Sequence, residues 1–287
     1  MIRIEQRQYK TYILSDVQTQ SELEIVPERG GMITKWRVNN KEILYLDQER
    51  FIIPDLSVRG GVPILFPICG NLPDNTYTIE GKKYTLKQHG FARDLPWEVI
   101  SQSEENGVSL TLGLKSNDLT KEAYPFECEV SFTYLLQRNT LKIIQNYHNQ
   151  SDRVMPFSTG LHPYFGIKDK NLLRFDIPSE EFIDQKTGAK YPFQGKFDLS
   201  WDEIDVIFPE LTGNTAKIKD LSQNLEISLK YDQTYTKIVF WTVKGKDFYC
   251  IEPWTAGRNA LNTKEKLLYL QPKTSLETQV EMTANFF

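Results

Sequence analysis

Two of the three histidines in the chain lie in segments where an imidazole could do acid–base chemistry. His89 belongs to a stretch rich in glycine, proline and charged residues, and His162 is followed directly by a proline and two aromatic residues. Imidazole exchanges a proton near neutral pH, so either side chain could act as a general acid or base. A partly buried histidine with satisfied hydrogen bonds is the structural alternative, which the sequence leaves open. His148 stands at the polar end of a predicted strand, and we expect no catalytic role for it.

Two carboxylates accompany these histidines. Glu252 ends an apolar run and precedes a proline and a tryptophan. A carboxylate on a mostly apolar wall has a raised pKa, which suits a general base that works near neutrality. An exposed glutamate at a strand end is the alternative. Asp205, in DEIDVIF, could bind a ligand hydroxyl or orient an imidazole, and Asp202 and Glu203 compete with it for that role.

Two arginines and several aromatic residues lie in the same unusual segments. Arg59 precedes two glycines, where we expect the backbone to approach a ligand closely, and Arg93 ends the stretch that contains His89. The planar guanidinium of either arginine could bind an anionic group or hydroxyls, and a structural salt bridge is the alternative. Trp254, Tyr164 and Phe66 have flat faces of the kind that pack against the C–H face of a sugar ring, although large aromatic residues are mostly found in the core.

The sequence excludes several other kinds of site. It has no G-x-G-x-x-G after a strand, no Walker loop and no G-x-S-x-G nucleophile elbow. The histidines and carboxylates lack metal-ligand spacing, so we expect neither a metal nor a cofactor. The three cysteines form no C-x-x-C pair, which argues against a disulfide framework and a zinc site and favours core positions, as for Cys69, Cys128 and Cys250.

Composition excludes several classes of partner. The net charge is −4 and the lysines and arginines are scattered, so we do not expect a nucleic-acid partner. No stretch approaches the roughly 18 apolar residues of a membrane span, and the N-terminus lacks the apolar region of a signal peptide. We therefore expect a cytoplasmic protein with a small-molecule partner. The oligomeric state stays open, and a monomer is compatible with the sequence.

Alternating apolar and polar residues predict mainly β-strands. Asn106-Gly107 indicates a hairpin turn, and 117–124 is the clearest helical segment, whereas 259–269 is ambiguous between loop and helix. Short strands at this spacing predict an all-β sandwich, and the absence of a linker predicts a single domain over 1–287. The expected strands cover residues 21–28, 32–38, 77–86, 97–114, 126–149, 225–231, 237–243, 247–252 and 275–287.

A few segments break the strand pattern and hold most of the residues named above. Their density of glycine, proline, aromatic and ionisable residues is typical of functional loops. The segments are 57–75, 88–97, 156–166 and 249–261.

Four motifs in order along the chain carry a resemblance to a known family. They are RGGVPILFP (59–67), QHGFAR (88–93), GLHPYF (160–165) and EPWTAGRNAL (252–261). Together they resemble the aldose 1-epimerase superfamily, also called galactose mutarotase-like, and within it the hexose-6-phosphate mutarotase branch. The resemblance runs from about residue 20 to the C-terminus. Asn71 stands where many members acting on free sugars have arginine, and Gly257 stands where the common motif has proline.

The resemblance implies a fold, a reaction and a set of site residues. The fold is a β-supersandwich with the sugar on a concave sheet. The reaction interconverts the α and β anomers of a hexose or hexose 6-phosphate by ring opening, with His162 as general acid and Glu252 as general base. His89 and Asp205 are implied to bind the sugar.

The same resemblance points to the remaining substrate contacts. Arg59 is implied to contact a phosphate, and Arg93 lies in a matching motif from which it could help. Trp254 offers an aromatic face in the motif that contains the base. Neither a metal nor a redox step is needed, because ring opening requires only proton transfer.

Two other functions stay open at this point. A sugar-binding protein without catalytic activity could use the same scaffold, because a fold alone does not determine function. A glycoside hydrolase is the other alternative, since Asp205 and Glu252 could supply the two carboxylates that such enzymes normally use.

Overall fold

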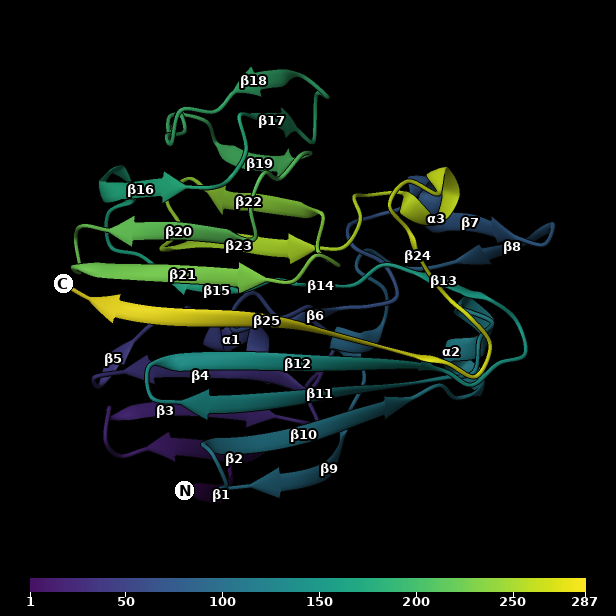
Figure 1. The fold of residues 1–287 in the computed structure, drawn as a ribbon, viewed down its shortest axis with the longest axis horizontal. Coiled ribbons are helices and arrows are strands. Elements are labelled where there is room, and N and C mark those ends of the chain that lie inside the picture. The colour runs from purple at the N-terminus through teal and green to yellow at the C-terminus, as the bar shows by residue number, and fades with distance from the viewer.

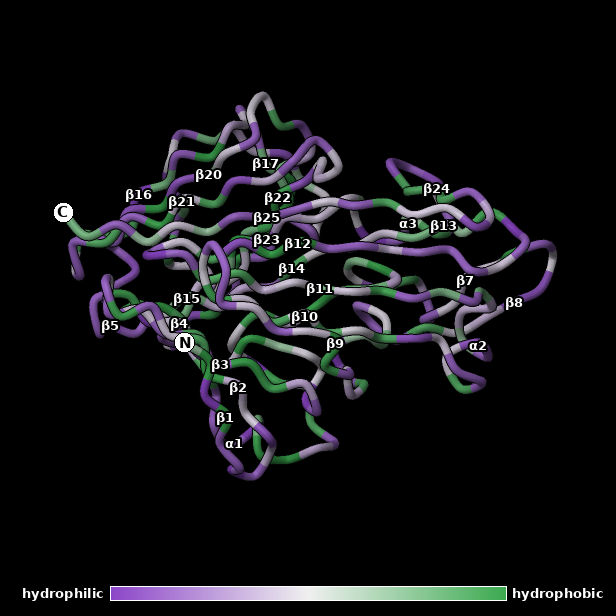
Figure 2. The backbone as a smooth tube through the Cα atoms, turned by 60° about the horizontal axis from the view of Figure 1, so that its bottom comes forward, coloured by the Kyte–Doolittle hydropathy of each residue, from purple (hydrophilic) through white to green (hydrophobic).

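Antiparallel strands dominate the computed structural model, which describes residues 1–287 (Figure 1). The strands in which buried and partly exposed residues alternate most regularly belong to one eight-stranded sheet. Figure 2 shows hydrophilic and hydrophobic residues alternating along them. Its order is β16 (Leu173–Asp176), β20 (Thr215–Asp220), β21 (Leu225–Tyr231), β25 (Ser275–Phe286), β12 (Thr140–Asn149), β11 (Cys128–Gln137), β10 (Val108–Lys115) and β9 (Glu98–Ser103).

A second eight-stranded sheet is more deeply buried. All seven residues of β23 are buried, because neighbouring strands and covering elements shield both faces of this strand. The order is β18 (Lys190–Pro192), β17 (Glu181–Asp184), β19 (Glu203–Phe208), β22 (Lys237–Val243), β23 (Phe248–Trp254), β14 (Gly160–Leu161) and β6 (Ile64–Leu65), with β15 (Tyr164–Gly166) also paired to β23.

The N-terminal strands form a third sheet, and short elements complete the fold. The third sheet runs β1 (Ile2–Gln6), β2 (Lys10–Asp16), β3 (Ser21–Val26), β4 (Met32–Val38) and β5 (Lys41–Glu42). Two small antiparallel sheets of two strands each are β7 (Thr76–Ile79) with β8 (Lys82–Thr85) and β13 (Met155–Phe157) with β24 (Leu268–Leu270). The helices are α1 (Gln48–Ile52), α2 (Asp118–Ala123) and α3 (Ala260–Thr263), with single 3₁₀ turns at Pro73–Asn75, Ala92–Asp94 and Lys170–Leu172.

One hydrophobic cluster of 62 buried residues joins the three larger sheets. Leu23 comes from the N-terminal sheet, Phe132 from the first large sheet and Ile251 from the second. The all-β sandwich predicted from the sequence is therefore confirmed. None of the helices has the length and apolar character needed to cross a membrane.

Most of the predicted strands are present, and the errors have a common cause. The strand signals over 97–114 and 126–149 correspond to β9–β10 and β11–β12, and helix α2 lies inside 117–124. The expected strand 247–252 corresponds to β23, which runs on to Trp254. The expectation that 156–166 breaks the strand pattern is wrong, because it contains β14, β15 and most of β13. Burial on both faces removes the alternation by which a strand is recognised.

The glycines after Arg59 serve packing rather than ligand approach. Gly60 (φ +139°) lies against the backbone of Leu46, and a Cβ atom on Gly61 (φ +62°) would overlap the carbonyl oxygen of Ile33. Neither glycine lines the pocket described below. The two glycines therefore let the backbone approach neighbouring segments of the chain, at Leu46 and Ile33, rather than a ligand. This packing fixes the position of Arg59.

We expect Gly61→Ala to destabilise the protein more than Gly245→Ala. Both glycines have positive φ, at +62° and +73°, but a Cβ at Gly245 would meet no atom within 4 Å. The conformational strain common to both is about 1–2 kcal/mol. The overlap at Gly61 adds roughly 1–3 kcal/mol. Urea denaturation of the two variants measures the difference, and equal losses would contradict the packing role.

Candidate active site

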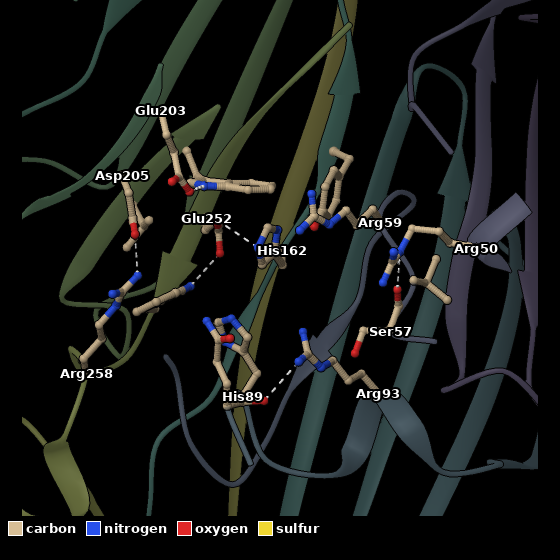
Figure 3. Close-up of a pocket in the computed structure, with 16 residues that line it drawn as sticks. Arg50, Ser57, Arg59, His89, Arg93, His162, Glu203, Asp205, Glu252 and Arg258 are labelled. Carbon is tan, nitrogen blue, oxygen red and sulfur yellow. Dashed lines mark hydrogen bonds and ion pairs between the residues drawn. The ribbon is translucent and has the colours of Figure 1, made fainter. Parts of the chain in front are cut away.

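The predicted site residues meet in one pocket of about 390 Å³ on the second large sheet (Figure 3). All seven of them line it, although they are up to 195 positions apart in the chain, between Arg59 and Trp254. The lining residues are Arg50, Ser57, Val58, Arg59, Gln88, His89, Arg93, His162, Tyr164, Glu203, Asp205, Val239, Trp241, Glu252, Trp254 and Arg258.

Glu252 and His162 contact each other at the centre of this pocket. His162 Nε2 lies 3.3 Å from Glu252 Oε1. Glu252 is on β23 and is 1% exposed, while His162 lies between β14 and β15 and is 8% exposed. Because β15 and β14 both pair with β23, the sheet itself brings the imidazole to the carboxylate.

Burial makes Glu252 a stronger base than an ordinary glutamate. Removal from water raises the pKa of Glu252 well above its usual value, and the nearby Asp205 carboxylate raises it further. A hydrogen bond from Trp254 Nε1 to Oε2, at 3.1 Å, opposes this shift and holds the carboxylate in place. Trp254 can reach it because residues two apart on a strand face the same side. The exposed strand-end position considered from the sequence is therefore excluded.

His162 is held between aromatic rings. It stacks on Tyr164 at a centroid distance of 4.7 Å and meets the edge of Trp241 at 5.7 Å. Burial lowers its pKa to about 3, and the positive charges of Arg93 and Arg59 contribute to the shift. The imidazole is therefore neutral at neutral pH. Its Nδ1 atom has no hydrogen-bond partner.

His89 presents one defined ring nitrogen to the pocket. Its Nδ1 accepts a hydrogen bond from the backbone N–H of Gly70 at 3.0 Å. Burial and the neighbouring Arg93 lower its pKa well below the usual value, so the ring is neutral. A neutral imidazole that accepts at Nδ1 has its proton on Nε2, so His89 is a hydrogen-bond donor at that atom.

Asp205 is fixed by two partners. Gln185 Nε2 donates to Oδ1 at 2.7 Å, and Arg258 Nη2 donates to Oδ2 at 2.6 Å. The residue is at the third position of β19, close to where the sequence placed it. Its neighbour Glu203 accepts a hydrogen bond from Trp241 Nε1 at 2.7 Å and also lines the pocket.

Three arginines at the other end of the pocket have no carboxylate partner. Figure 3 shows Arg50, Arg59 and Arg93 on one side of His162, opposite Asp205 and Arg258. Arg50 Nε donates to the carbonyl oxygen of Ser57 at 3.1 Å, and Arg93 Nη2 donates to that of Gln88 at 3.0 Å. The guanidinium of Arg59 lies 5.9 Å from the Trp241 ring centroid. The salt bridges considered for Arg59 and Arg93 from the sequence are not present.

Sequence reasoning missed several of the lining residues. Arg258 stands inside the EPWTAGRNAL motif, so a signal for it was available. Trp241 lies in a strand whose apolar residues read as core, and Arg50 lies in a short polar helix that no pattern predicted. Trp241 reaches the pocket because of the strand pairing of β22, and Arg50 reaches it because of where α1 lies.

One group of possible metal ligands overlaps the pair. Ligand atoms of His162, Cys250 and Glu252 lie within 4.8 Å of one another. Cys250 and Glu252 share a face of β23, and no spacing in the sequence reveals their closeness to His162. Cys250, like Cys69 and Cys128, is a buried free thiol, as expected from the sequence. Catalysis without a metal stays a prediction.

Known proteins with a similar sequence identify the family. Residues 17–280 match the family model described as aldose 1-epimerase. The chain belongs to the aldose 1-epimerase family. A protein of Escherichia coli (strain K12) provisionally named glucose-6-phosphate 1-epimerase is 25% identical over 265 residues, which are 84% of this chain and 83% of that protein. A Salmonella typhimurium protein with the same provisional name is 28% identical over 164 residues, 56% of this chain and only about half (51%) of that protein.

Solved structures agree with this assignment. A protein from Synechocystis sp. PCC 6803 has 45% identity and a TM-score of 0.96, with 100% of both chains covered. A galactose mutarotase-like protein from Clostridium acetobutylicum has 22% identity and a TM-score of 0.84, covers 100% of this chain and 99% of its own, and shows the shared fold. The expected resemblance and fold are confirmed, and the family supports a mutarotase function with a sugar as the substrate.

The electrostatics of the pocket predict an unusual titration of His162. Since its pKa is lowered to about 3, the ring of the empty site should stay neutral as the pH falls through the ordinary histidine value of about 6.5. Imidazole ¹⁵N chemical shifts followed against pH report the protonation state, and His162→Asn identifies the signal. Protonation of His162 close to pH 6.5 would contradict the burial and charge argument.

Proposed function

We propose that this protein interconverts the α and β anomers of a hexose 6-phosphate, and of free hexoses less efficiently, by acid–base ring opening. The observation that carries the proposal is the buried His162–Glu252 pair, 3.3 Å apart, in a pocket whose other end has three arginines without carboxylate partners. The pair supplies the proton transfers, and the arginines supply a binding site for an anion.

The geometry of the pair suits ring opening. The anomeric oxygen O1 and the ring oxygen O5 are bonded to the same carbon, so the base and the acid must converge on neighbouring points. Glu252 takes the proton from the O1 hydroxyl while His162 gives a proton to O5, and the C1–O5 bond breaks to leave a free aldehyde. Rotation about C1–C2 and reclosure with the proton roles reversed produce the other anomer.

The pair needs no proton from solvent to reach its reactive state. A neutral Glu252 carboxyl with a neutral His162 has the same number of protons as a carboxylate with an imidazolium. Moving one proton from the first to the second therefore produces the charged pair. Burial of both groups disfavours the charged pair, and the charges of Arg93 and Arg59 disfavour the imidazolium.

A bound phosphate would make this proton movement easier. Arg93 and Arg59 both lower the pKa of His162. A phosphate between these two arginines offsets their positive charge, so the pKa of His162 rises when the substrate is bound. The anionic group therefore contributes to catalysis as well as to binding.

Other lining residues hold the sugar ring. The Nε2–H of His89 donates to a sugar oxygen, and the Asp205 carboxylate, oriented by Arg258 and Gln185, accepts from a sugar hydroxyl. Trp254 is 1% exposed, so its main contribution is the hydrogen bond to Glu252 rather than an open ring face. Trp241 is less buried and offers such a face beside His162.

The two alternatives left open by the sequence have less support. A binding protein does not require a buried imidazole–carboxylate pair with shifted proton affinities. A glycoside hydrolase would use Asp205 as the second carboxyl group, but Arg258 and Gln185 already bind its two oxygens. Product analysis separates the reactions, because a hydrolase releases a new reducing end and a mutarotase changes only the anomer ratio.

We expect Glu252→Gln and His162→Asn each to lower catalysed anomer exchange by roughly 10²–10⁴-fold. The amide of the first variant can still accept the Trp254 hydrogen bond, so the fold should persist. Exchange NMR measures the rate, and circular dichroism checks the fold. His148→Asn is the matched control, because His148 bonds to Ser275 outside the pocket. Near wild-type rates in both active-site variants would exclude the proposed pair.

The phosphate proposal predicts a selective loss in Arg59→Ala and Arg93→Ala. A charge-assisted hydrogen bond contributes about 1.5–3 kcal/mol. Glucose 6-phosphate exchange should therefore fall by roughly tenfold to a hundredfold in kcat/KM, with little change for glucose. Arg174→Ala is the control, since Arg174 donates to the backbone carbonyls of Asn171 and Leu173 and lies outside the pocket. Equal losses for both sugars would leave an epimerase of free aldoses.

A further inference from the structure

Arg29 is a buried arginine whose hydrogen bonds all go to backbone carbonyls. It lies in the turn between β3 and β4, is 7% exposed and forms no ion pair. Its Nη1 donates to Pro54 at 2.9 Å and its Nη2 to Ile53 at 2.8 Å. The guanidinium also donates to the carbonyl oxygens of Arg50, Phe51 and Leu56. One side chain thus binds five carbonyls within a seven-residue stretch, 50–56.

That stretch has little other support. Helix α1 contains no buried residue, and Ile52 and Ile53 are 49% and 44% exposed. Figure 2 shows α1 at the edge of the molecule. Gln8 Nε2 donates to the carbonyl of Ile52 at 2.6 Å, and Phe51 meets the edge of the Tyr9 ring. Hydrogen bonds, rather than a hydrophobic core, therefore determine where this segment lies.

The same segment carries one end of the pocket. Arg50 and Ser57 both line it, and Arg50 Nε donates to the Ser57 carbonyl at 3.1 Å, which closes the segment on itself. Arg59 follows two residues later, with its backbone carbonyl accepting from Asp47 N–H at the start of α1. Arg29 does not line the pocket, but it binds the carbonyl of Arg50 itself.

We propose that Arg29 is a positioning residue for the anionic end of the substrate: it holds the segment 50–56 so that Arg50 and Arg59 face the pocket. The inference rests on the proposed hexose-phosphate function. A planar guanidinium is required, because its fork of donors reaches several carbonyls at once, which a lysine ammonium cannot do in the same geometry. The acid–base pair lies on other elements, β14, β15 and β23, so it should be unaffected.

The test is Arg29→Lys, assayed with glucose 6-phosphate and with glucose. We expect KM for glucose 6-phosphate to rise by roughly tenfold or more, because small displacements of a binding group cost large factors. We expect kcat, and kcat/KM for glucose, to stay within about twofold. Arg174→Lys is the matched control, since Arg174 also donates to backbone carbonyls but lies away from the pocket.

Gln8→Ala provides a second variant if Arg29→Lys does not fold. It removes another side-chain hydrogen bond to the segment, at Ile52, and should raise KM for glucose 6-phosphate in the same selective way. Unchanged kinetics in the variants that fold, or equal losses for both sugars, would overturn the positioning role. If Arg59→Ala is selective for the phosphosugar while these variants are not, only this inference fails. If Arg59→Ala is not selective either, the hexose-phosphate function fails with it.

Discussion

The burial of one carboxylate, Glu252, is the constraint on which the rest of this site depends. An isolated charge in a protein interior is strongly disfavoured, so a buried carboxyl group needs hydrogen bonds or a raised pKa. Glu252 has both: Trp254 Nε1 donates a hydrogen bond to one of its oxygens, and burial raises its pKa. His162 Nε2 lies 3.3 Å from the other oxygen. Because β23 is buried along its whole length, water has little access to the carboxylate. The result is a base whose proton affinity is raised and whose orientation is set by its own strand.

The charges around this pair divide the pocket into two different ends. At one end Arg258 is neutralised by Asp205, so that corner can bind hydroxyl groups without attracting an anion. At the other end Arg50, Arg59 and Arg93 keep uncompensated positive charge near His162. A substrate with one anionic group therefore has a single favoured orientation. Burial lowers the pKa of His162, and the same positive charge lowers it further, so the imidazole is neutral at neutral pH.

Most of the fold and the central residues could be predicted from the sequence, for physical reasons. Strands such as β11 and β12 have one face on the core and one toward solvent, so their alternation is visible. The short strands β14 and β15 beside the site are largely buried and lose that signal, which is why 156–166 was misread as irregular. His162 and Glu252 were found because motifs, rather than periodicity, marked them.

The remaining features depend on contacts between distant segments. Nothing in the sequence places Arg50 beside Arg93, or shows that the carboxylate partner of Arg258 is Asp205. The role of Gly60 and Gly61 in packing against Leu46 and Ile33 was also hidden, because a glycine pair suits a ligand loop equally well. Arg29 lies in no recognisable motif, and its proposed role in positioning segment 50–56 becomes visible only when the carbonyls that it binds are known.

The orientation of a bound substrate tests the account most directly. The measurement is a crystal structure of the Glu252→Gln variant with glucose 6-phosphate. The account predicts O1 against the side chain at position 252, O5 against His162 Nε2, and the phosphate between Arg59 and Arg93. A sugar bound with its phosphate beside Asp205 and Arg258, or with C1 turned away from His162, would contradict both the acid–base assignment and the division of the pocket into two ends.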